Sequence, residues 1–440
     1  MRIFAQNSCT LIHNYKQAMD YLYRNLPMFQ RQGAAAMKKD LTNIRLLLEA
    51  MGNPHKQFKS IHVGGTNGKG SASHMLSAMF QSQGYRVGVY TSPHYKDFRE
   101  RMKINSAEKV QLIPKTEVVD FINQFESVIE DIRPSFFEIT VAMAFKYFAD
   151  QKVDLAIVEV GLGGRLDSTN VLDPIVSLIT NISFDHQQFL GNTLPLIAGE
   201  KAGIIKKNTP IVIGETQNEV ETVFRTKAEQ MNAVLEYADQ MLEASYNQET
   251  RQISVFGNGI DLMFDAKWFT PYQLKNVQSA LYTFLTFVRI ESLDVDWEKL
   301  RSYLENMPTV SYFLGRWMLL GESPKIIAES AHNEAGLEYL MKQLGQENYE
   351  ELHMIVGFSD DKDLNKILPK FPQKARYYYV KADIPRGMET TKLKELAIKN
   401  GLIGRSYSSV KNALRAAKRR ACSSDLIFVG GSIFVVAEVV

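Results

Sequence analysis

The chain has 440 residues, of which 45% are hydrophobic and 23% are charged. This length and composition predict a globular protein with more than one domain and exclude a disordered or fibrous chain. Lysine and arginine number 51 against 49 aspartate and glutamate, for a net charge of +2. Such a balance excludes the broad positive field that holds nucleic acid or an anionic membrane, so any acidic ligand must be recognised locally.

The number of cysteines and the length of the apolar segments indicate the cellular compartment of the protein. Cys9 and Cys422 lie far apart in the sequence, and we expect two inert thiols rather than a disulfide or a metal pair. No run approaches the roughly 20 apolar residues of a membrane span, and the N-terminus lacks the apolar core of a signal peptide. We therefore expect a cytoplasmic protein with no membrane or nucleic-acid partner.

The first half of the chain reads as alternating strands and helices. Residues 58–63 predict a strand that enters a glycine-rich turn, a helix follows over 69–83, and residues 87–90 predict the next strand. Further buried strands are expected at 155–160, 175–179 and 210–213, with a long helical stretch over 117–150 before them. Strands joined by crossover helices predict a mainly parallel sheet.

The pattern restarts in the last third of the chain. Strands are expected at 325–328, 353–356, 377–380 and 426–429, alternating with helical stretches. The segment 305–315 contains Pro308 and has no strong periodicity, so we place the linker there. The predicted domains are 1–307, the larger, and 308–440, a smaller α/β domain.

The strongest chemical signal is the glycine-rich segment between the first strand and its helix, which reads His62-Val-Gly-Gly-Thr-Asn-Gly-Lys-Gly-Ser71. Glycines let backbone N–H groups approach phosphate oxygens, the helix N-terminus adds positive potential, and Lys69 can reach the terminal phosphates. The spacing departs from the common P-loop, because Val63 occupies the first-glycine position. The alternative is a glycine-rich turn with a solvated lysine.

Three other features carry weaker signals. A second glycine cluster follows the strand at 155–160, but Leu166 replaces the third glycine of a dinucleotide fingerprint. Glu138 begins an otherwise apolar helical stretch, which indicates either a metal ligand or a carboxylate in the first helical turn. His186, after Asp185, follows a strand end where open α/β sheets place ligands.

These motifs occur together in one order, which changes their weight. The chain contains Gly-Thr-Asn-Gly-Lys-Gly-Ser, Thr91-Ser-Pro-His94, Phe136-Phe-Glu138, Gly161-Leu-Gly-Gly-Arg-Leu-Asp-Ser-Thr-Asn170, Asp185-His186 and Glu200-Lys-Ala-Gly-Ile-Ile205. This set resembles the folylpolyglutamate synthase and dihydrofolate synthase family of the Mur ligases, over nearly the whole chain. The resemblance implies a large P-loop-type ATPase domain that binds ATP and folate, followed by a smaller Rossmann-like glutamate ligase domain.

The resemblance also implies roles for individual residues. The ATP-binding residues would be Thr66, Asn67, Gly68, Lys69, Gly70, Ser71, Asn276, Arg316 and Glu329. The magnesium ligands would be Ser92, Glu138, His186 and Lys201, the last as a carbamate serving a second magnesium. Lys69, Glu138, His186 and Lys201 would be the catalytic residues.

The small domain departs from the family pattern. The usual Asp-Gly-Ala-His-Asn is Glu329-Ser-Ala-His332-Asn333 here, and the usual Pro-Gly-Arg is Leu314-Gly-Arg316, while Asp361-Lys362-Asp363 is kept. We expect Glu329 to keep an acidic contact with the nucleotide, and His332 and Asn333 to lie on the glutamate side. His332 can alternatively be a helix-entry residue without a chemical role.

The implied reaction is ATP-dependent joining of L-glutamate to dihydropteroate, to the terminal glutamate of reduced folates, or to both. ATP would convert a carboxylate into an acyl phosphate, which the amino group of glutamate then attacks. We expect a monomer with ATP, two magnesium ions, glutamate and a pteroate or folate as ligands. The competing hypotheses are a Mur-type ligase acting on another carboxylate, a P-loop phosphotransferase or ATPase, and a homologue that binds folate without chemistry.

Overall fold

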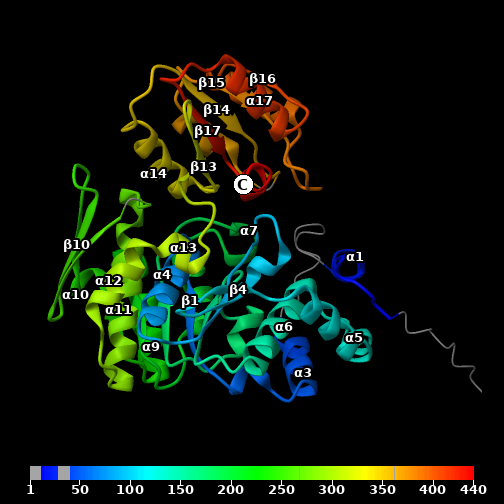
Figure 1. Cartoon of the computed structure of the whole chain (residues 1–440), viewed down its shortest axis with the longest axis vertical. Helices are drawn as coiled ribbons and strands as arrows, with labels where there is room; N and C mark the ends of the chain where they lie inside the picture. Colours follow the sequence, from blue (N-terminus) through cyan, green and yellow to red (C-terminus); the bar gives the residue numbers. More distant parts are fainter. Residues whose placement is uncertain (1–10, 28–39, 267, 361) are drawn as a thin grey trace, which may run out of the picture.

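The computed structural model describes residues 11–27, 40–266, 268–360 and 362–440. In this part of the chain two α/β domains lie one above the other, with the small domain over the large one (Figure 1). Two residues named above, Cys9 and Asp361, lie outside the described residues. Cys422 is an exposed free thiol, and among the described helices none is both long enough and apolar enough to cross a membrane.

The large domain is built on an eight-stranded sheet with the order β4-β3-β2-β5-β1-β6-β7-β8. Its strands are β1 (Lys59–Gly64), β2 (Val87–Tyr90), β3 (Met102–Asn105), β4 (Val110–Leu112), β5 (Leu155–Glu159), β6 (Val176–Ile179), β7 (Ile211–Ile213) and β8 (Leu235–Tyr237). In the order of the sheet, the neighbours β2, β5, β1, β6, β7 and β8 pair in parallel. The strands β3 and β4 extend the sheet beyond β2 with antiparallel pairing. The five strands expected here from the sequence are confirmed, and so is the mainly parallel sheet.

Both faces of this sheet are buried because alternate residues of its strands enter different cores. In β5, Leu155 and Ile157 pack on one side with helices α4, α11 and α12, whereas Ala156 and Val158 pack on the other with α1, α3, α5 and α6. The helices of this domain are α1 (Tyr15–Asn25), α3 (Thr42–Ala50), α4 (Lys69–Ser82), α5 (Lys115–Ile132), α6 (Phe136–Asp150), α7 (Gln187–Leu190), α8 (Leu194–Lys201), α9 (Asn218–Met231), α10 (Ala238–Met241), α11 (Leu274–Glu291), α12 (Trp297–Glu305) and α13 (Met307–Ser311).

The helical stretch expected over 117–150 is two helices. Arg133 adopts a left-handed conformation with φ of 51° and ends α5, and Pro134 follows before α6 begins at Phe136. A proline cannot continue a helix because it lacks an N–H and its ring clashes with the preceding turn. This break puts Glu138 at the start of a helix rather than inside one.

A small antiparallel sheet stands beside the large domain and was not expected from the sequence. Its strands are β9 (Glu243–Asn247), β10 (Gln252–Gly257) and β11 (Ile260–Asp265). It packs on α11 and α12 (Figure 1). Asn258 and Gly259 form the turn between β10 and β11 with φ of 50° and 81°, the conformation of the tight turns that Asn-Gly favours.

The small domain carries a six-stranded sheet with the order β12-β13-β17-β14-β15-β16, in which only β12 is antiparallel. The strands are β12 (Met318–Glu322), β13 (Lys325–Glu329), β14 (Leu352–Val356), β15 (Arg376–Tyr379), β16 (Gly404–Ser406) and β17 (Leu426–Gly430). The helices are α14 (Glu334–Leu344), α15 (Leu364–Ile367), α16 (Thr390–Lys399), α17 (Val410–Arg420) and α18 (Ile433–Ala437). The four expected strands are present, and the Rossmann-like architecture is confirmed.

The connection between the domains is short. Helix α13 packs on α4, and Met307 is buried in the core of the large domain, with Phe313 packed against it. The sheet of the small domain starts at Met318. The domain boundary after residue 307 stays a prediction. The packing of α13 associates this helix with the large domain, so the chain passes from one domain to the other near Arg316.

Candidate active site

The glycine-rich segment joins β1 to α4 through a turn that requires glycine at two positions. Gly65 has φ of +130°, and a Cβ there would lie 1.9 Å from Thr180 Oγ1. Gly68 has φ of +84°, and a Cβ there would lie 1.9 Å from Asn276 Oδ1. Side chains are excluded by strain and by contact. The first amides of α4 have no partners within the helix, so the turn presents them to an anion.

The turn is held by the loop that follows β6. The Asn67 amide donates to Asn181 Oδ1 at 3.1 Å, and Asn67 Nδ2 donates to Ser183 Oγ at 3.1 Å. Lys69 Nζ donates to the Thr66 carbonyl at 3.1 Å, so the ammonium lies over its own loop. The segment from Thr66 to Ser71 therefore has the strand–turn–helix form of a phosphate cradle, while its contacts with a nucleotide stay a prediction.

A buried carboxylate stands beside the cradle, and it belongs to Glu159. This residue ends β5, next to β1, and its Oε2 accepts the Ser92 amide at 3.1 Å. A Cβ on Gly70 would lie 3.8 Å from both Glu159 carboxylate oxygens, so the absent side chain leaves them facing the helix start. Burial raises the pKa of Glu159, while the charge of Lys69 and the Ser92 amide act to lower it.

Glu138 was expected at this place, and the structure puts its carboxylate elsewhere. Glu138 is the third residue of α6, and its Oε2 accepts the Ser135 amide at 2.6 Å and the Ser135 hydroxyl at 2.8 Å. The Glu138 amide in turn donates to Ser135 Oγ. This capping box satisfies the first amides of the helix. The carboxylate beside Ser92 is therefore that of Glu159 and not, as expected, that of Glu138, which caps its own helix.

Lys201 ends α8 and is buried, and its Nζ donates to the carbonyl of Gly65 at 2.7 Å. Burial, followed by the nearby charge of Lys69, lowers the pKa of Lys201 to about 7. A substantial fraction of the amine is therefore neutral near pH 7. Only the neutral amine reacts with CO₂, so this environment favours a carbamate; the modification itself stays a prediction.

Asp185 links the cradle side of the large domain to the small domain, a role that was not assigned to it from the sequence. Lys362 Nζ donates to Asp185 Oδ1 at 2.7 Å, and His332 Nε2 lies 3.5 Å from Asp185 Oδ2. Asn333 Nδ2 donates to Asn67 Oδ1 at 2.8 Å and lies 3.4 Å from Asp185 Oδ2. Of the expected substrate-side residues, Asn333 therefore contacts the cradle directly, whereas His332 and Lys362 reach Asp185 beside it.

His186 follows Asp185 and precedes α7. Its Nε2 lies 3.8 Å from Asp185 Oδ2. Burial lowers the pKa of His186 to about 4 even though the charge of Asp185 acts to raise it. The imidazole is therefore neutral at pH 7, the form that binds a metal ion.

The remaining residues expected to bind the nucleotide are Asn276, Arg316 and Glu329, which lie near the connection between the two domains. Asn276 is buried in the first turn of α11 against Gly68. Arg316 Nη1 contacts Tyr95 Oη at 3.1 Å and lies 3.7 Å from Glu329 Oε1. Glu329 Oε2 accepts from Tyr272 Oη at 2.6 Å and from the Trp317 amide at 2.8 Å. Glu329 therefore connects the small domain to its own linker and to Tyr272, in the turn just before α11. These contacts favour a role in positioning Arg316 rather than a direct contact with a nucleotide.

The donor set around the cradle fits a hard divalent cation. Burial has the largest effect on the pKa values of Glu159, His186 and Lys201, and the charge of Lys69 then lowers all three. The charge of the Lys69 ammonium therefore reaches all three side chains. A buried carboxylate, a neutral imidazole and the Ser92 hydroxyl supply the oxygen and nitrogen ligands that Mg²⁺ or Mn²⁺ accepts.

Two hollows open from this arrangement. One is lined by cradle residues and by the linker, including Gly70, Ser92, Glu159 and Arg316. The other lies between the domains and is lined by Asp185, His186, Asn333 and Lys362 together with residues of α15. The cradle side and the small-domain side of the site are therefore both open to small molecules.

Comparison with known proteins follows the two domains. Residues 63–283 match the Mur ligase middle domain, and residues 315–433 match the Mur ligase glutamate ligase domain. A dihydrofolate synthase/folylpolyglutamate synthase of Bacillus subtilis is 30% identical over 444 residues, which cover 97% of this chain and 98% of that protein. A probable bifunctional folylpolyglutamate synthase/dihydropteroate synthase of Haloferax volcanii is 32% identical over 437 residues, and this chain spans 50% of its length.

Solved structures agree with these matches. Escherichia coli FolC in complex with DHPP and ADP is 27% identical, with a TM-score of 0.85 over 98% of this chain and 97% of that one. A bifunctional folylpolyglutamate synthase/dihydrofolate synthase with Mn, AMPPNP and L-glutamate bound is 28% identical, with a TM-score of 0.83 over 98% of both chains. The chain belongs to the folylpolyglutamate synthase/dihydrofolate synthase family of the Mur ligases.

Proposed function

We propose that this protein joins L-glutamate to dihydropteroate and to the terminal glutamate of reduced folates at the expense of ATP. The observation that carries the proposal is the meeting of the two domains at the cradle. Asn333 of the small domain donates to Asn67 of the cradle, and Lys362 pairs with Asp185 beside it. A ligase needs this arrangement because activated carboxylate and amine must meet where water is excluded.

The cradle residues account for the ATP half of the reaction. The amides at the start of α4 and the Lys69 ammonium bind the phosphates and offset the charge that grows on the transferred phosphoryl group. The acceptor carboxylate attacks the γ-phosphorus of ATP and becomes an acyl phosphate, with ADP as the leaving group. Phosphate is then a far better leaving group than the oxide of a free carboxylate.

The second half of the reaction belongs to the cleft between the domains. The amino group of glutamate attacks the acyl carbon, phosphate leaves, and an amide bond forms. His332, Asn333 and Lys362 stand on the small-domain wall near Asp185. We assign them to holding glutamate in line with the acyl phosphate, because Lys362 and the Asn333 amide can pair with carboxylates.

Ser92, Glu159 and His186 are the proposed ligands of a catalytic magnesium ion. Such an ion would neutralise negative charge between the phosphates of ATP and the incoming carboxylate. Solved relatives are described with ADP, AMPPNP and Mn, which supports nucleotide and divalent metal binding here. A second magnesium held by a carbamate of Lys201 is a finer proposal, and the lowered pKa of Lys201 supports it.

We further propose that the enzyme is monomeric and cytoplasmic and that it uses both pteroate and folate acceptors. The test is ADP release by the purified protein with ATP, Mg²⁺ and L-glutamate, with dihydropteroate and tetrahydrofolate compared as acceptors and Lys69→Ala as the inactive control. Release that requires glutamate and either acceptor supports the proposal. Release without an amino acid would indicate an ATPase, release with glutamate alone would indicate that glutamate itself is phosphorylated, and no release with either acceptor would indicate a ligase for another carboxylate.

A further inference from the structure

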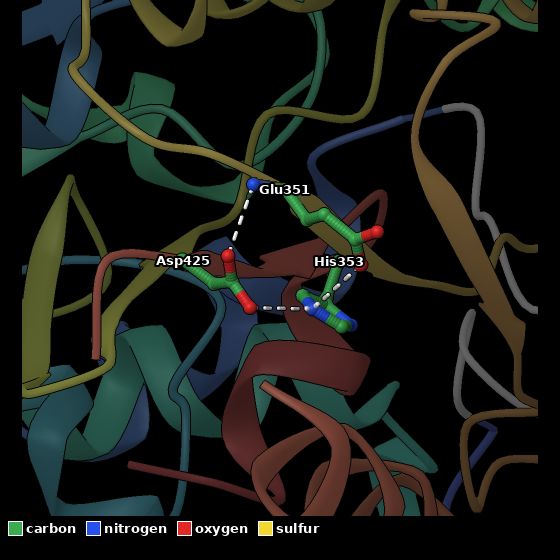
Figure 2. A group of neighbouring side chains, drawn as sticks. All are labelled: Glu351, His353 and Asp425. Carbon is green, nitrogen blue, oxygen red and sulfur yellow. Dashed lines mark hydrogen bonds and ion pairs between the residues drawn. The ribbon is translucent and has the colours of Figure 1, made fainter. Parts of the chain in front are cut away.

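Three side chains gather at the amino-terminal edge of the small-domain sheet (Figure 2). Glu351 immediately precedes β14, His353 lies within it, and Asp425 immediately precedes β17. The two strands are parallel neighbours with Leu352 opposite Leu426, so their amino ends coincide. The active site lies at the other edge, where Glu329 ends β13 and pairs with Gly430 at the end of β17. The cluster is therefore separate from the catalytic centre.

The three side chains converge on one point. His353 Nε2 lies 3.5 Å from Asp425 Oδ2 and 3.9 Å from Glu351 Oε2. One donor atom from each residue lies within 4.8 Å of the other two. Figure 2 shows the imidazole nitrogen turned toward both carboxylates.

His353 supplies the second observation. The residue is fully buried, and its Nε2 makes no hydrogen bond to any described residue, because the contact with Asp425 is an ion-pair distance without hydrogen-bond geometry. The other ring nitrogen, Nδ1, is bound by Tyr378 Oη at 2.9 Å. Buried polar atoms are normally satisfied, so a nitrogen left open toward two carboxylates calls for a cation. A hydrogen bond on the far nitrogen is how metal-binding histidines are oriented.

The carboxylates are also held in place. Asp425 accepts the Glu351 amide at 3.0 Å through Oδ1 and the Cys422 amide at 2.7 Å through Oδ2. Arg376 binds both oxygens of Glu351, at 2.5 Å and 2.7 Å. Each carboxylate oxygen keeps a second lone pair. Two carboxylates and one guanidinium leave the cluster with a net negative charge, which favours a divalent ion.

We propose that Glu351, His353 and Asp425 bind a divalent transition-metal ion, with Zn²⁺ as the best match. A tetrahedral ion with bonds of about 2.0–2.2 Å holds neighbouring ligand atoms roughly 3.3–3.6 Å apart. The distances from Nε2 to the two carboxylates, 3.5 Å and 3.9 Å, need only small side-chain rotations to meet this value. One imidazole with two carboxylates is a ligand set that Zn²⁺ takes with four-coordinate geometry, whereas Mg²⁺ and Ca²⁺ need six or more ligands that are mostly oxygen. The ion fastens the turn at residues 422–425 to the start of β14.

The experiment uses Co²⁺ as a coloured substitute for Zn²⁺ and the full-length protein without nucleotide. All samples carry Glu159→Gln, which weakens metal binding at the catalytic centre. Bound Co²⁺ is counted by equilibrium dialysis, and its coordination is read from visible absorption. The expected result is one equivalent of four-coordinate Co²⁺ that Zn²⁺ displaces.

Three further substitutions decide whether that equivalent sits at this cluster. His353→Gln and Glu351→Gln should each lose it; Glu351 is exposed, so its variant remains informative if burial makes His353→Gln unstable. Glu338→Gln, which removes an exposed carboxylate paired with Lys370 in the same domain, should keep it. The proposal would be overturned if the protein carrying Glu159→Gln alone bound no equivalent of Co²⁺. It would also be overturned if adding His353→Gln or Glu351→Gln left the amount of bound Co²⁺ unchanged.

Discussion

Replacing Glu159 with glutamine should remove most of the activity without weakening the fold. The substitution keeps the shape of a side chain that accepts the Ser92 amide at 3.1 Å and faces Gly70, and it removes only the charge. Burial raises the pKa of Glu159, so the ionised carboxylate is less favourable in the folded protein than in water. Neutralising it therefore costs no stability through charge, and the free energy of unfolding should be unchanged or higher.

The expected loss of activity follows from the position of the carboxylate. A carboxylate stabilises the negative charge of the transition state only through the magnesium ion that it would hold, and losing one stabilising group in a closed site typically lowers kcat by about 10²–10³-fold, or about 2.7–4 kcal/mol. Even partners that only orient metal ligands change metal affinity by about 10–100-fold. Glu159→Gln should therefore lower kcat by at least about 100-fold and raise the Mg²⁺ concentration needed for half-maximal rate.

Glu138→Gln is the matched control, since both positions are buried glutamates changed to the isosteric amide. The carbonyl oxygen of glutamine can accept the Ser135 amide and hydroxyl as Glu138 does, and glutamine serves in capping boxes. Stability should change by less than about 1 kcal/mol, and the Mg²⁺ titration should match that of the parent. The assay is ADP release across a Mg²⁺ series, with thermal unfolding of each variant. A changed Mg²⁺ dependence in Glu138→Gln together with a normal one in Glu159→Gln would refute the proposal that Glu159, and not Glu138, is the metal ligand.

Other substitutions test the remaining parts of the site. Lys69→Ala should lower ADP formation by about 10²–10³-fold while the circular dichroism spectrum is kept; glutamate-dependent turnover near the parent rate would remove Lys69 from phosphate binding. Lys201→Ala should lose most activity and regain part of it with added short carboxylates, whereas Lys201→Arg should stay inactive because it keeps a cation without donor oxygens; an active Lys201→Arg would exclude the carbamate. Asp185→Asn should lower kcat/KM for glutamate by about 10–100-fold, since hydrogen bonds to charged groups contribute about 1.5–3 kcal/mol and Lys362 and Asn333 both contact this carboxylate; unchanged glutamate kinetics would contradict the linking role of Asp185.

Local features of the molecule could be predicted from the sequence. The cradle lies within one strand–turn–helix unit, and Gly65, Gly68 and Lys69 are neighbours along the chain. Buried strands such as β2 and β5 are continuous apolar runs bounded by turns, which is how parallel strands read. The order of two domains followed from the same alternation.

Glu159 could not be assigned from local sequence because its role depends on strand order. It faces the cradle because β5 lies next to β1, although about ninety residues separate the two strands in the chain. For Glu138 the residues alone left a metal ligand and a carboxylate in the first helical turn open, and the family resemblance decided for the ligand. In the structure its partner is Ser135, three residues earlier. The Ser-x-x-Glu spacing after Pro134 was the available signal for a cap.

The contacts between the two domains also could not be predicted from local sequence patterns. Asp185 and Lys362 are brought together by the packing of one domain on the other, and no periodicity encodes that contact. The small antiparallel sheet, by contrast, had a readable signal. Ile253 and Val255 are buried at alternate positions before Asn258-Gly259, which is the pattern of a hairpin.

The central claim is that ATP cleavage is coupled to formation of a glutamyl amide. The direct measurement incubates the protein with ATP, Mg²⁺, isotopically labelled L-glutamate and either dihydropteroate or tetrahydrofolate, and compares ADP released with product identified by mass spectrometry. We expect one ADP for each labelled glutamyl group added to the acceptor, and no ADP above background when glutamate or acceptor is left out. ADP released at full rate without a labelled product would contradict the claim.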